Sequence, residues 1–495
     1  MAKRKAKKRT YKRRSKYLST SSDWSFELIE KYYYEIERIA TKKFGLEVYA
    51  NEIDVISSEQ MLDAYSSNAM PVMYNHWSYG KHFVQQETYY LHKGMGLAYE
   101  VVINSNPCIA YLMEENTMVL QALVIAHACF GHNSFFKNNY MFTQWTDADA
   151  IIDYLVFAKK YVAECEEKYG VEAVEEVLDS CHTIQNYGVD RYKRAPELSI
   201  VEEKERQKER DEFRQRNLND LWRTIPKKEK KEKLEGEELF PSEPQENVLY
   251  FIEKNAPNLE TWKRELIRIV RKINQYFYPQ RQTKLMNEGW ATFWHYTIIN
   301  ELYNEGKVND AFMLEFISHH TNVIMQYPFN SKYYSGVSVY ALGFAMFMDI
   351  KRMCENPTDE DKEWFPDLAG KDWNETIHFA MLNFKDESFI QQFLSPKVIR
   401  DFHFFSVVDD DQDTELEVSA IHNKSGYRQV RNMLSKQYDT IAIEPNIQVY
   451  SVDRWGDRKL TLRHYMHNRR PLDPETTEDV LKHVMNLWKF DVALQ

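Results

Sequence analysis

Two histidines five residues apart are the first residues of this chain whose spacing could carry chemistry. His127 and His132 enclose the sequence His-Ala-Cys-Phe-Gly-His at the end of an apolar helical stretch that starts at Asn116. Imidazoles at positions i and i+4 of a helix face one side and commonly ligate zinc. The i, i+5 spacing found here separates the two directions by about 140° on an ideal helix. The rings can therefore share a metal ion only if the helix widens by one residue or ends between them, which Gly131 permits.

The segment lacks the general base of a standard zinc peptidase motif. In His-Glu-x-x-His the glutamate takes that role, whereas Ala128 stands at this position here. Glu115, just before the helix, is the candidate replacement as catalytic base. The alternative is that His127 is a core histidine bonded to a neighbouring carbonyl or carboxylate, because an unpaired buried polar group costs about 1–3 kcal/mol.

A second polar group lies far along the chain, on a helix rich in aromatic residues. Glu288, Thr292 and His295 fall at i, i+4 and i+7 and form one polar stripe. Acidic and imidazole groups in such a setting must be paired, protonated or bound to metal. Glu288 would complete a nitrogen, nitrogen, oxygen ligand set with His127 and His132, leaving one position for water, and His295 could move protons. A hydrogen-bonded pair between Glu288 and either His295 or His127 is the open alternative.

Two further histidines are possible extra ligands. His76 lies in an aromatic segment, and His182 follows a cysteine in a helical stretch. A single histidine in either setting more often has a structural role than a metal-binding one. A di-iron carboxylate site requires Glu-x-x-His on two helices, and the nearest form here is Asp179-Ser-Cys-His182. The expected cofactor is therefore zinc or another divalent metal.

Composition narrows the class of protein. The 495 residues include only 15 glycines and no Gly-x-Gly-x-x-Gly or Walker loop, so a nucleotide fold is not expected. Five cysteines without a Cys-x-x-Cys pair fit free thiols in a reducing compartment, which predicts a cytoplasmic protein. We see no signal peptide and no apolar run near the about 20 residues of a membrane span, so no membrane partner is expected.

Charge is distributed unevenly along the chain. Residues 1–17 contain ten Lys or Arg and no acid, although the whole chain has a net charge of −11. This basic tail is typical of a disordered, solubilising extension, and the alternative is an arm for nucleic acid. Because the remainder is acidic and would repel phosphates, nucleic-acid binding beyond the tail is not expected.

Helical periodicity dominates from Trp24 onward, so a mostly α fold is predicted. The predicted helices are Asp147–Tyr169, Val171–Gln185, Asn247–Tyr276, Met286–Tyr303, Ala311–Met325, Val339–Cys354, Gly426–Tyr438 and Glu478–Lys489. Short strands are predicted at Phe402–Val408, Glu415–Ile421, Ile447–Val452 and Lys459–His464. The expected organisation is a basic tail over 1–21, a large helical, zincin-like domain over 22–395 with a charged connector at 201–245, and a small α+β C-terminal domain over 396–495.

Seven segments resemble the stage V sporulation protein R (SpoVR) family. They are HWSYGK, INSNPCIAYLMEENT, AHACFGHNSFFKNN, NYGVDRYKR, FPSEPQEN, MNEGWATFWHYT and ALGFAMF. The resemblance runs from about Ser22 to the C-terminus, and it departs from the family at Val337-Ser-Val-Tyr340, where an Asn-Pro-Tyr is usual. It implies a role in spore-cortex formation, or in stationary-phase and stress physiology in bacteria that make no spores. It also implies a PrkA-type serine protein kinase and a von Willebrand-like protein as partners.

Two functions follow from these observations. The first is a metal-dependent hydrolase of peptide or peptidoglycan-type amide bonds, centred on His127, His132 and Glu288. The second is a non-enzymatic partner or scaffold in a serine-kinase-linked stress module, in which the same histidines only form hydrogen bonds in the core.

Overall fold

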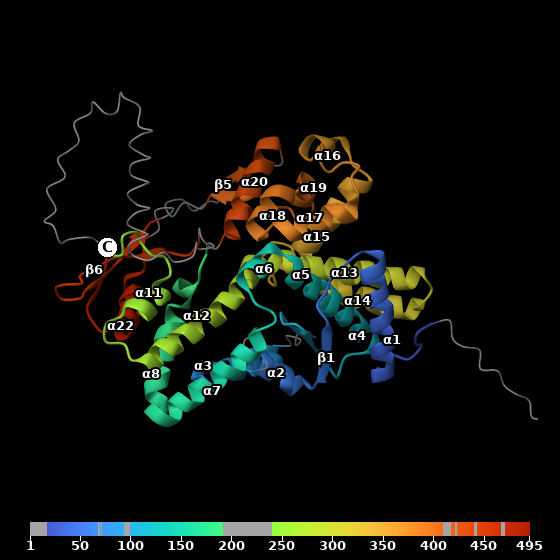
Figure 1. The fold of residues 1–495 in the computed structure, drawn as a ribbon. Coiled ribbons are helices and arrows are strands. Elements are labelled where there is room, and N and C mark those ends of the chain that lie inside the picture. The colour runs from blue at the N-terminus through green and yellow to red at the C-terminus, as the bar shows by residue number, and fades with distance from the viewer. Residues whose placement is uncertain are drawn as a thin grey trace, which may run out of the picture. The chain divides into compact units, whose positions relative to one another are not determined.

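The computed structural model divides into two compact units (Figure 1). Unit 1 comprises Met1–Gly170 and Tyr276–Glu444, and unit 2 comprises Val171–Gln275 and Pro445–Gln495. The structure describes residues 17–67, 70, 72–93, 100–191, 240–408, 417–420, 423–439, 443–466 and 471–495. The predicted basic tail up to residue 16, and the predicted charged connector up to residue 239, lie outside the described residues.

Unit 1 is built mainly from helices. Its N-terminal part contains α1 (Phe26–Glu37), the π-helix η1 (Arg38–Lys43), β1 (Asn51–Ile56), α2 (Ser58–Ser66), α3 (Trp77–Lys93), β2 (Glu100–Ile103), β3 (Cys108–Met113), α4 (Met118–Ile125), the π-helix η2 (Ala126–His132), α5 (Asn133–Asn138), α6 (Tyr140–Trp145) and α7 (Ile151–Tyr169). Its second part contains α13 (Lys284–Asn304), α14 (Asp310–Val323), α15 (Val339–Glu355), α16 (Asp359–Trp364), α17 (Trp373–Asn383), α18 (Asp386–Phe393), α19 (Pro396–Asp401), β4 (Ser406–Val408), β5 (Glu417–Ala420) and α20 (Lys424–Gln437).

Unit 2 joins an internal segment to the C-terminus of the chain. It contains α8 (Val171–Thr183), the 3-10 helix η3 (Gln185–Gly188), α11 (Val248–Asn255), most of α12 (Thr261–Gln282), β6 (Asn446–Val452), β7 (Leu460–Tyr465), α22 (Pro474–Trp488) and β8 (Val492–Leu494). β7 pairs antiparallel with β6 and parallel with β8. α22 packs on α8, where Asn486 Nδ2 donates to Ser180 Oγ over 3.1 Å. α8 therefore folds with residues 445–495 at the C-terminus.

Most predicted elements are present, with one interruption that the periodicity did not indicate. The predicted helix Asn247–Tyr276 is two helices, α11 and α12, separated by a break at Pro257. Proline has no N–H to donate and its ring disfavours helical backbone in the residue before it, so the single-helix prediction was wrong there. The predicted predominance of helix is confirmed.

A small sheet in unit 1 was not predicted from the sequence. β1 pairs parallel with β3, and β2 pairs antiparallel with β3, in the order β1-β3-β2. Val101 and Ile103 of β2 are buried, whereas Glu100 and Val102 are half-buried on the other face. Because successive side chains alternate between faces of a strand, Glu100 emerges on the face opposite the apolar pair. β2 lies beside η2.

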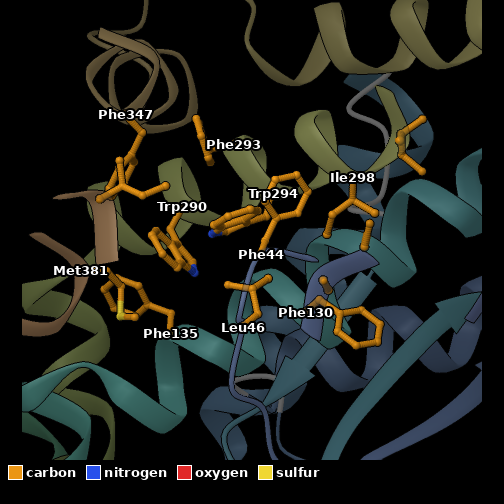
Figure 2. Packing of buried hydrophobic residues seen from close by; sticks show 14 of the residues in the cluster. Phe44, Leu46, Phe130, Phe135, Trp290, Phe293, Trp294, Ile298, Phe347 and Met381 are labelled. Atoms are coloured by element: carbon orange, nitrogen blue, oxygen red, sulfur yellow. The ribbon is translucent and has the colours of Figure 1, made fainter. Parts of the chain in front are cut away.

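Helix α13 runs through the main hydrophobic core (Figure 2). Trp290, Phe293 and Trp294 are fully buried, and Figure 2 shows them among aromatic side chains from other elements, including Phe44 and Phe347. α13 meets α15 at two glycines: a Cβ on Gly289 would lie 2.5 Å from the Gly343 carbonyl carbon. Only glycine at both positions allows backbones to approach this closely.

The division into units differs from the expected boundary before residue 396. Helix α20 buries Tyr427, Val430 and Leu434 in the same hydrophobic cluster as Phe389 of α18 and Ile399 of α19. Burying that apolar stripe favours unit 1 as the location of α20. The strands β6, β7 and β8 belong to unit 2.

One helical run among the described residues is long and apolar enough to cross a membrane. It covers Met118–Asn138, with a mean hydropathy of 1.2 in its most apolar window. No run of this length was anticipated from the sequence. All of that window is buried inside the protein, as expected for a core helix.

Candidate metal centre

A π-helix brings the two histidines of the His-x-x-x-x-His segment to the same side. Both belong to η2, in which the Asn133 N–H donates to the Ala128 carbonyl five residues earlier. Residues five apart face alike when hydrogen bonds run from i to i+5. The ring centroids of His127 and His132 are accordingly 4.6 Å apart. The helix has widened by one residue, which the spacing required if the rings were to converge.

Gly131 allows η2 to lie against α13. A Cβ at this position would be 2.6 Å from Ala291 Cα and 2.8 Å from Ala291 Cβ, so no larger residue fits without moving a helix. The next turn of α13 towards its N-terminus carries Glu288. The close approach therefore places this carboxylate beside the two imidazoles.

Two carboxylates face the imidazoles, one from α13 and one from β2. His127 Nε2 lies 3.2 Å from Glu100 Oε1 and 3.7 Å from Glu288 Oε2. His132 Nε2 lies 3.9 Å and 3.4 Å from the same two atoms. All four side chains are at most 19% exposed. We refer to these four residues as the His2Glu2 cluster.

The four imidazole–carboxylate separations in the His2Glu2 cluster are similar to those of ligands around one cation, and the donor atoms of Glu100, His127 and His132 all lie within 4.8 Å of one another. Zinc bonds of about 2.0–2.2 Å at tetrahedral angles place neighbouring donor atoms about 3.3–3.6 Å apart, which falls within the observed 3.2–3.9 Å. Two carboxylates and two neutral imidazoles carry a charge of −2, which a divalent cation neutralises. Glu288 Oε2 is buried and has no hydrogen-bond partner among the described residues. The donor set therefore fits a divalent metal.

In both imidazoles Nδ1, the nitrogen that faces away from the carboxylates, lies within hydrogen-bond distance of another side chain. His132 Nδ1 lies 2.9 Å from Asn287 Oδ1. Because an amide oxygen only accepts, His132 carries a proton on Nδ1, which leaves Nε2 facing the cluster. His127 Nδ1 lies 2.9 Å from His295 Nδ1, and His295 Nε2 lies 2.8 Å from His320 Nδ1. Such outer contacts orient metal-binding histidines and select their tautomer.

The electrostatics of the cluster favour a positive charge at its centre. Burial alone would raise the pKa of Glu288, but His132 and His127 hold it well below its ordinary value. Burial alone would lower the pKa of His132, but Glu288 and Glu100 raise it to about 9. Burial raises the pKa of Glu100. The same carboxylates that hold a proton on His132 would attract a cation in its place.

The two histidines behind the cluster both have lowered pKa values. Burial, followed by the charge of His127, holds the pKa of His295 well below its ordinary value. The same two causes lower the pKa of His320 to about 4. His295 contacts His127 at Nδ1, whereas the carboxylates lie at Nε2 of the same ring. His295 is therefore not one of the groups that converge as candidate ligands.

The structure does not bring the other predicted residues into the cluster. The Glu115 carboxylate lies near the start of α2, where Oε1 accepts from the Ser58 N–H over 3.4 Å. His76 is buried at the start of α3, with its Nδ1 2.7 Å from Ser78 Oγ. His182 is half-buried on α8, in unit 2.

Glu100 was missed by the sequence analysis, which looked for the fourth group beside the histidine helix. The available signal was weak: a glutamate at the start of the β-branched run Val101-Val-Ile103. Its position next to His127 depends on the packing of β2 beside η2, and no local pattern specifies that packing.

Comparison with known proteins places the chain in a family. The family model described as "SpoVR like protein" matches residues 23–443, and the model "SpoVR-like C-terminal domain" matches residues 445–495. The chain belongs to the SpoVR family. The boundary between the two family models, at residue 444, coincides with the last change of unit in the structure.

A relative within the SpoVR family covers almost the whole chain. It is "Uncharacterized protein YcgB" of Escherichia coli (strain K12), 63% identical over 478 residues, which amount to 97% of this chain and 93% of the relative. No solved structure matches. The predicted family is thus confirmed, and the His2Glu2 cluster is the feature from which a function can be argued.

Proposed function

We propose that this SpoVR protein is a metal-dependent hydrolase of peptide or peptidoglycan-type amide bonds, working in bacterial stationary-phase, sporulation or stress physiology. The observation that supports it is the convergence of two imidazoles and two carboxylates from η2, α13 and β2 at ligand spacing. The physiological part rests on the resemblance to the family. Two histidines from one helix and a glutamate from a later one would make the centre zincin-like in its ligands.

His127, His132 and Glu288 would hold the cation, zinc being the candidate that suits this donor set. A divalent cation in such a site supplies Lewis acidity and lowers the pKa of a coordinated water to about 7. Three protein ligands are typical of catalytic zinc sites because they leave a position open.

Glu100 would act as the general base in place of Glu115. Its Oε1 lies 3.2 Å from His127 Nε2 and 3.9 Å from His132 Nε2. The donor atoms of Glu100, His127 and His132 lie within 4.8 Å of one another, so Glu100 is the carboxylate that stays beside the centre when Glu288 serves as the third ligand. A base must lie within hydrogen-bond reach of the water that it deprotonates, and the short distances from Glu100 to both ligand nitrogens support that role.

Metal content tests the proposal first. Freshly purified protein should carry close to one zinc per chain by elemental analysis, and His127→Ala and Glu288→Gln should lose it. Glu100→Gln should keep the metal and lose hydrolysis of a peptide and muropeptide panel. The matched control is His319→Ala, which removes a histidine on α14 that pairs with Glu315 outside the cluster. Wild-type protein that neither contains zinc nor takes it up on dialysis would refute the metal centre.

A further inference from the structure

Three buried histidines form a continuous line of hydrogen bonds leading away from the His2Glu2 cluster. His127 on η2, His295 on α13 and His320 on α14 are 4%, 0% and 5% exposed. The contacts join His127 Nδ1 to His295 Nδ1 at 2.9 Å, and His295 Nε2 to His320 Nδ1 at 2.8 Å. Each pair of nitrogens can share only one proton, so the positions of the protons along the line depend on one another.

Binding of a cation by His127 fixes the position of each proton along the three histidines. A neutral imidazole has one N–H, so His127 can offer Nε2 to a cation only when its proton is on Nδ1. That N–H must then donate to His295 Nδ1, which places the proton of His295 on Nε2. The second contact follows in the same direction, because His295 Nε2–H donates to His320 Nδ1.

We propose that His320 is a positioning residue for the metal centre, acting through His295 to hold His127 in the tautomer that can bind a cation. The inference rests on the proposed metal function and extends it to a histidine that does not touch the cluster. An acceptor at His320 Nδ1 keeps the proton of His295 on Nε2. His295 Nδ1 is then always an acceptor for His127.

The aromatic surroundings of His320 hold its ring in this orientation. Phe316 stacks on it at a centroid distance of 5.9 Å, and Tyr296 and Phe344 lie at 4.8 Å and 5.0 Å. A ring enclosed in this way cannot turn its Nδ1 away from His295 without displacing neighbours. The second candidate ligand, His132, has a separate outer acceptor in Asn287. Loss of His320 should therefore weaken one ligand and leave the other in place.

The test compares zinc affinity in two variants of His320 with a neighbouring control. His320→Phe keeps an aromatic ring in the cage but removes the acceptor, whereas His320→Asn keeps an acceptor oxygen close to the position of Nδ1. His319→Ala alters the adjacent half-buried histidine. Competition with a chromophoric chelator should show about tenfold weaker zinc binding for His320→Phe, within the range for lost outer contacts. His320→Asn should stay within about threefold of wild type, and His319→Ala should be unchanged.

The outcomes separate this inference from the proposed function. Unchanged affinity in His320→Phe, together with loss of zinc in His127→Ala, overturns the role of His320 alone. Absence of zinc from wild-type protein overturns both. If His320→Phe does not fold, nitrogen NMR of the histidines in zinc-loaded wild type decides: the expected protons are on Nδ1 of His127 and on Nε2 of His295 and His320. A proton on His295 Nδ1 overturns the inference.

Discussion

Substituting alanine for Gly131 should disrupt the proposed metal centre while leaving the protein folded. The added Cβ would lie 2.6 Å from Ala291 Cα, whereas ordinary contact begins at 3.4 Å. Relief of the overlap therefore requires η2 and α13 to move apart by about 0.8 Å at this point. Metal sites tolerate departures of about 0.2 Å in ligand distance, so His132 and Glu288 should no longer reach one cation.

Gly131→Ala should have a small effect on stability and a large effect on zinc affinity. Overpacking of this kind costs about 1–3 kcal/mol, which a well-packed unit of this size should survive. We expect a folded variant whose urea midpoint is lowered and whose zinc affinity is reduced by about 100-fold, as for a displaced ligand. Circular dichroism in urea measures the first quantity and chelator competition the second.

A matched glycine provides the control. Gly80 lies in helix α3 and is exposed, and nothing lies within 4 Å of the position of its missing Cβ. Gly80→Ala should therefore leave zinc binding unchanged and raise stability by up to about 1 kcal/mol, through helix propensity alone. If Gly131→Ala binds zinc as tightly as Gly80→Ala does, the close approach of η2 and α13 does not position the ligands, and the reasoning fails.

Three further outcomes are expected. Asn287→Ala should weaken zinc binding about 10–100-fold by removing the acceptor of His132, and Asn287→Asp should retain it; equal affinity in both contradicts the role of this contact. Gly343→Ala should destabilise the protein by about 1–3 kcal/mol, because its Cβ would lie 2.4 Å from the Leu285 carbonyl oxygen; a melting temperature unchanged in calorimetry contradicts it. Burial alone would raise the pKa of Asp361, but Arg352 and neighbouring donors lower it to about 2 from 3.8. This carboxylate therefore stabilises the fold above pH 3.8 and loses that effect as the pH falls towards 2, so Asp361→Asn should cost about 2 kcal/mol in urea denaturation at pH 7 and progressively less below pH 4.

Helices were predictable wherever their signals are local. α13, α14 and α15 begin and end within two residues of the predicted bounds, because apolar periodicity and capping residues such as Asn309 and Ser338 lie within each segment. The break at Pro257 shows the limit of periodicity, since the apolar pattern continues across it. β1, β2 and β3 were missed because short apolar runs fit a helix or a strand equally well, and because β1 pairs with a strand far along the chain, Asn51 lying opposite Cys108.

The sequence by itself determined that His127 and His132 could converge only on a widened helix, and that Glu288 was the distant residue able to join them. These conclusions depend on residue type and on helical geometry, which act over a few residues. Only the tertiary structure decided that Glu100 completes the cluster and that His295 lies behind His127. Those placements depend on the packing of β2 beside η2 and on glycine contacts between helices far apart in the chain. Packing of this kind is a property of surfaces that meet only after folding, so no single stretch of sequence encodes it.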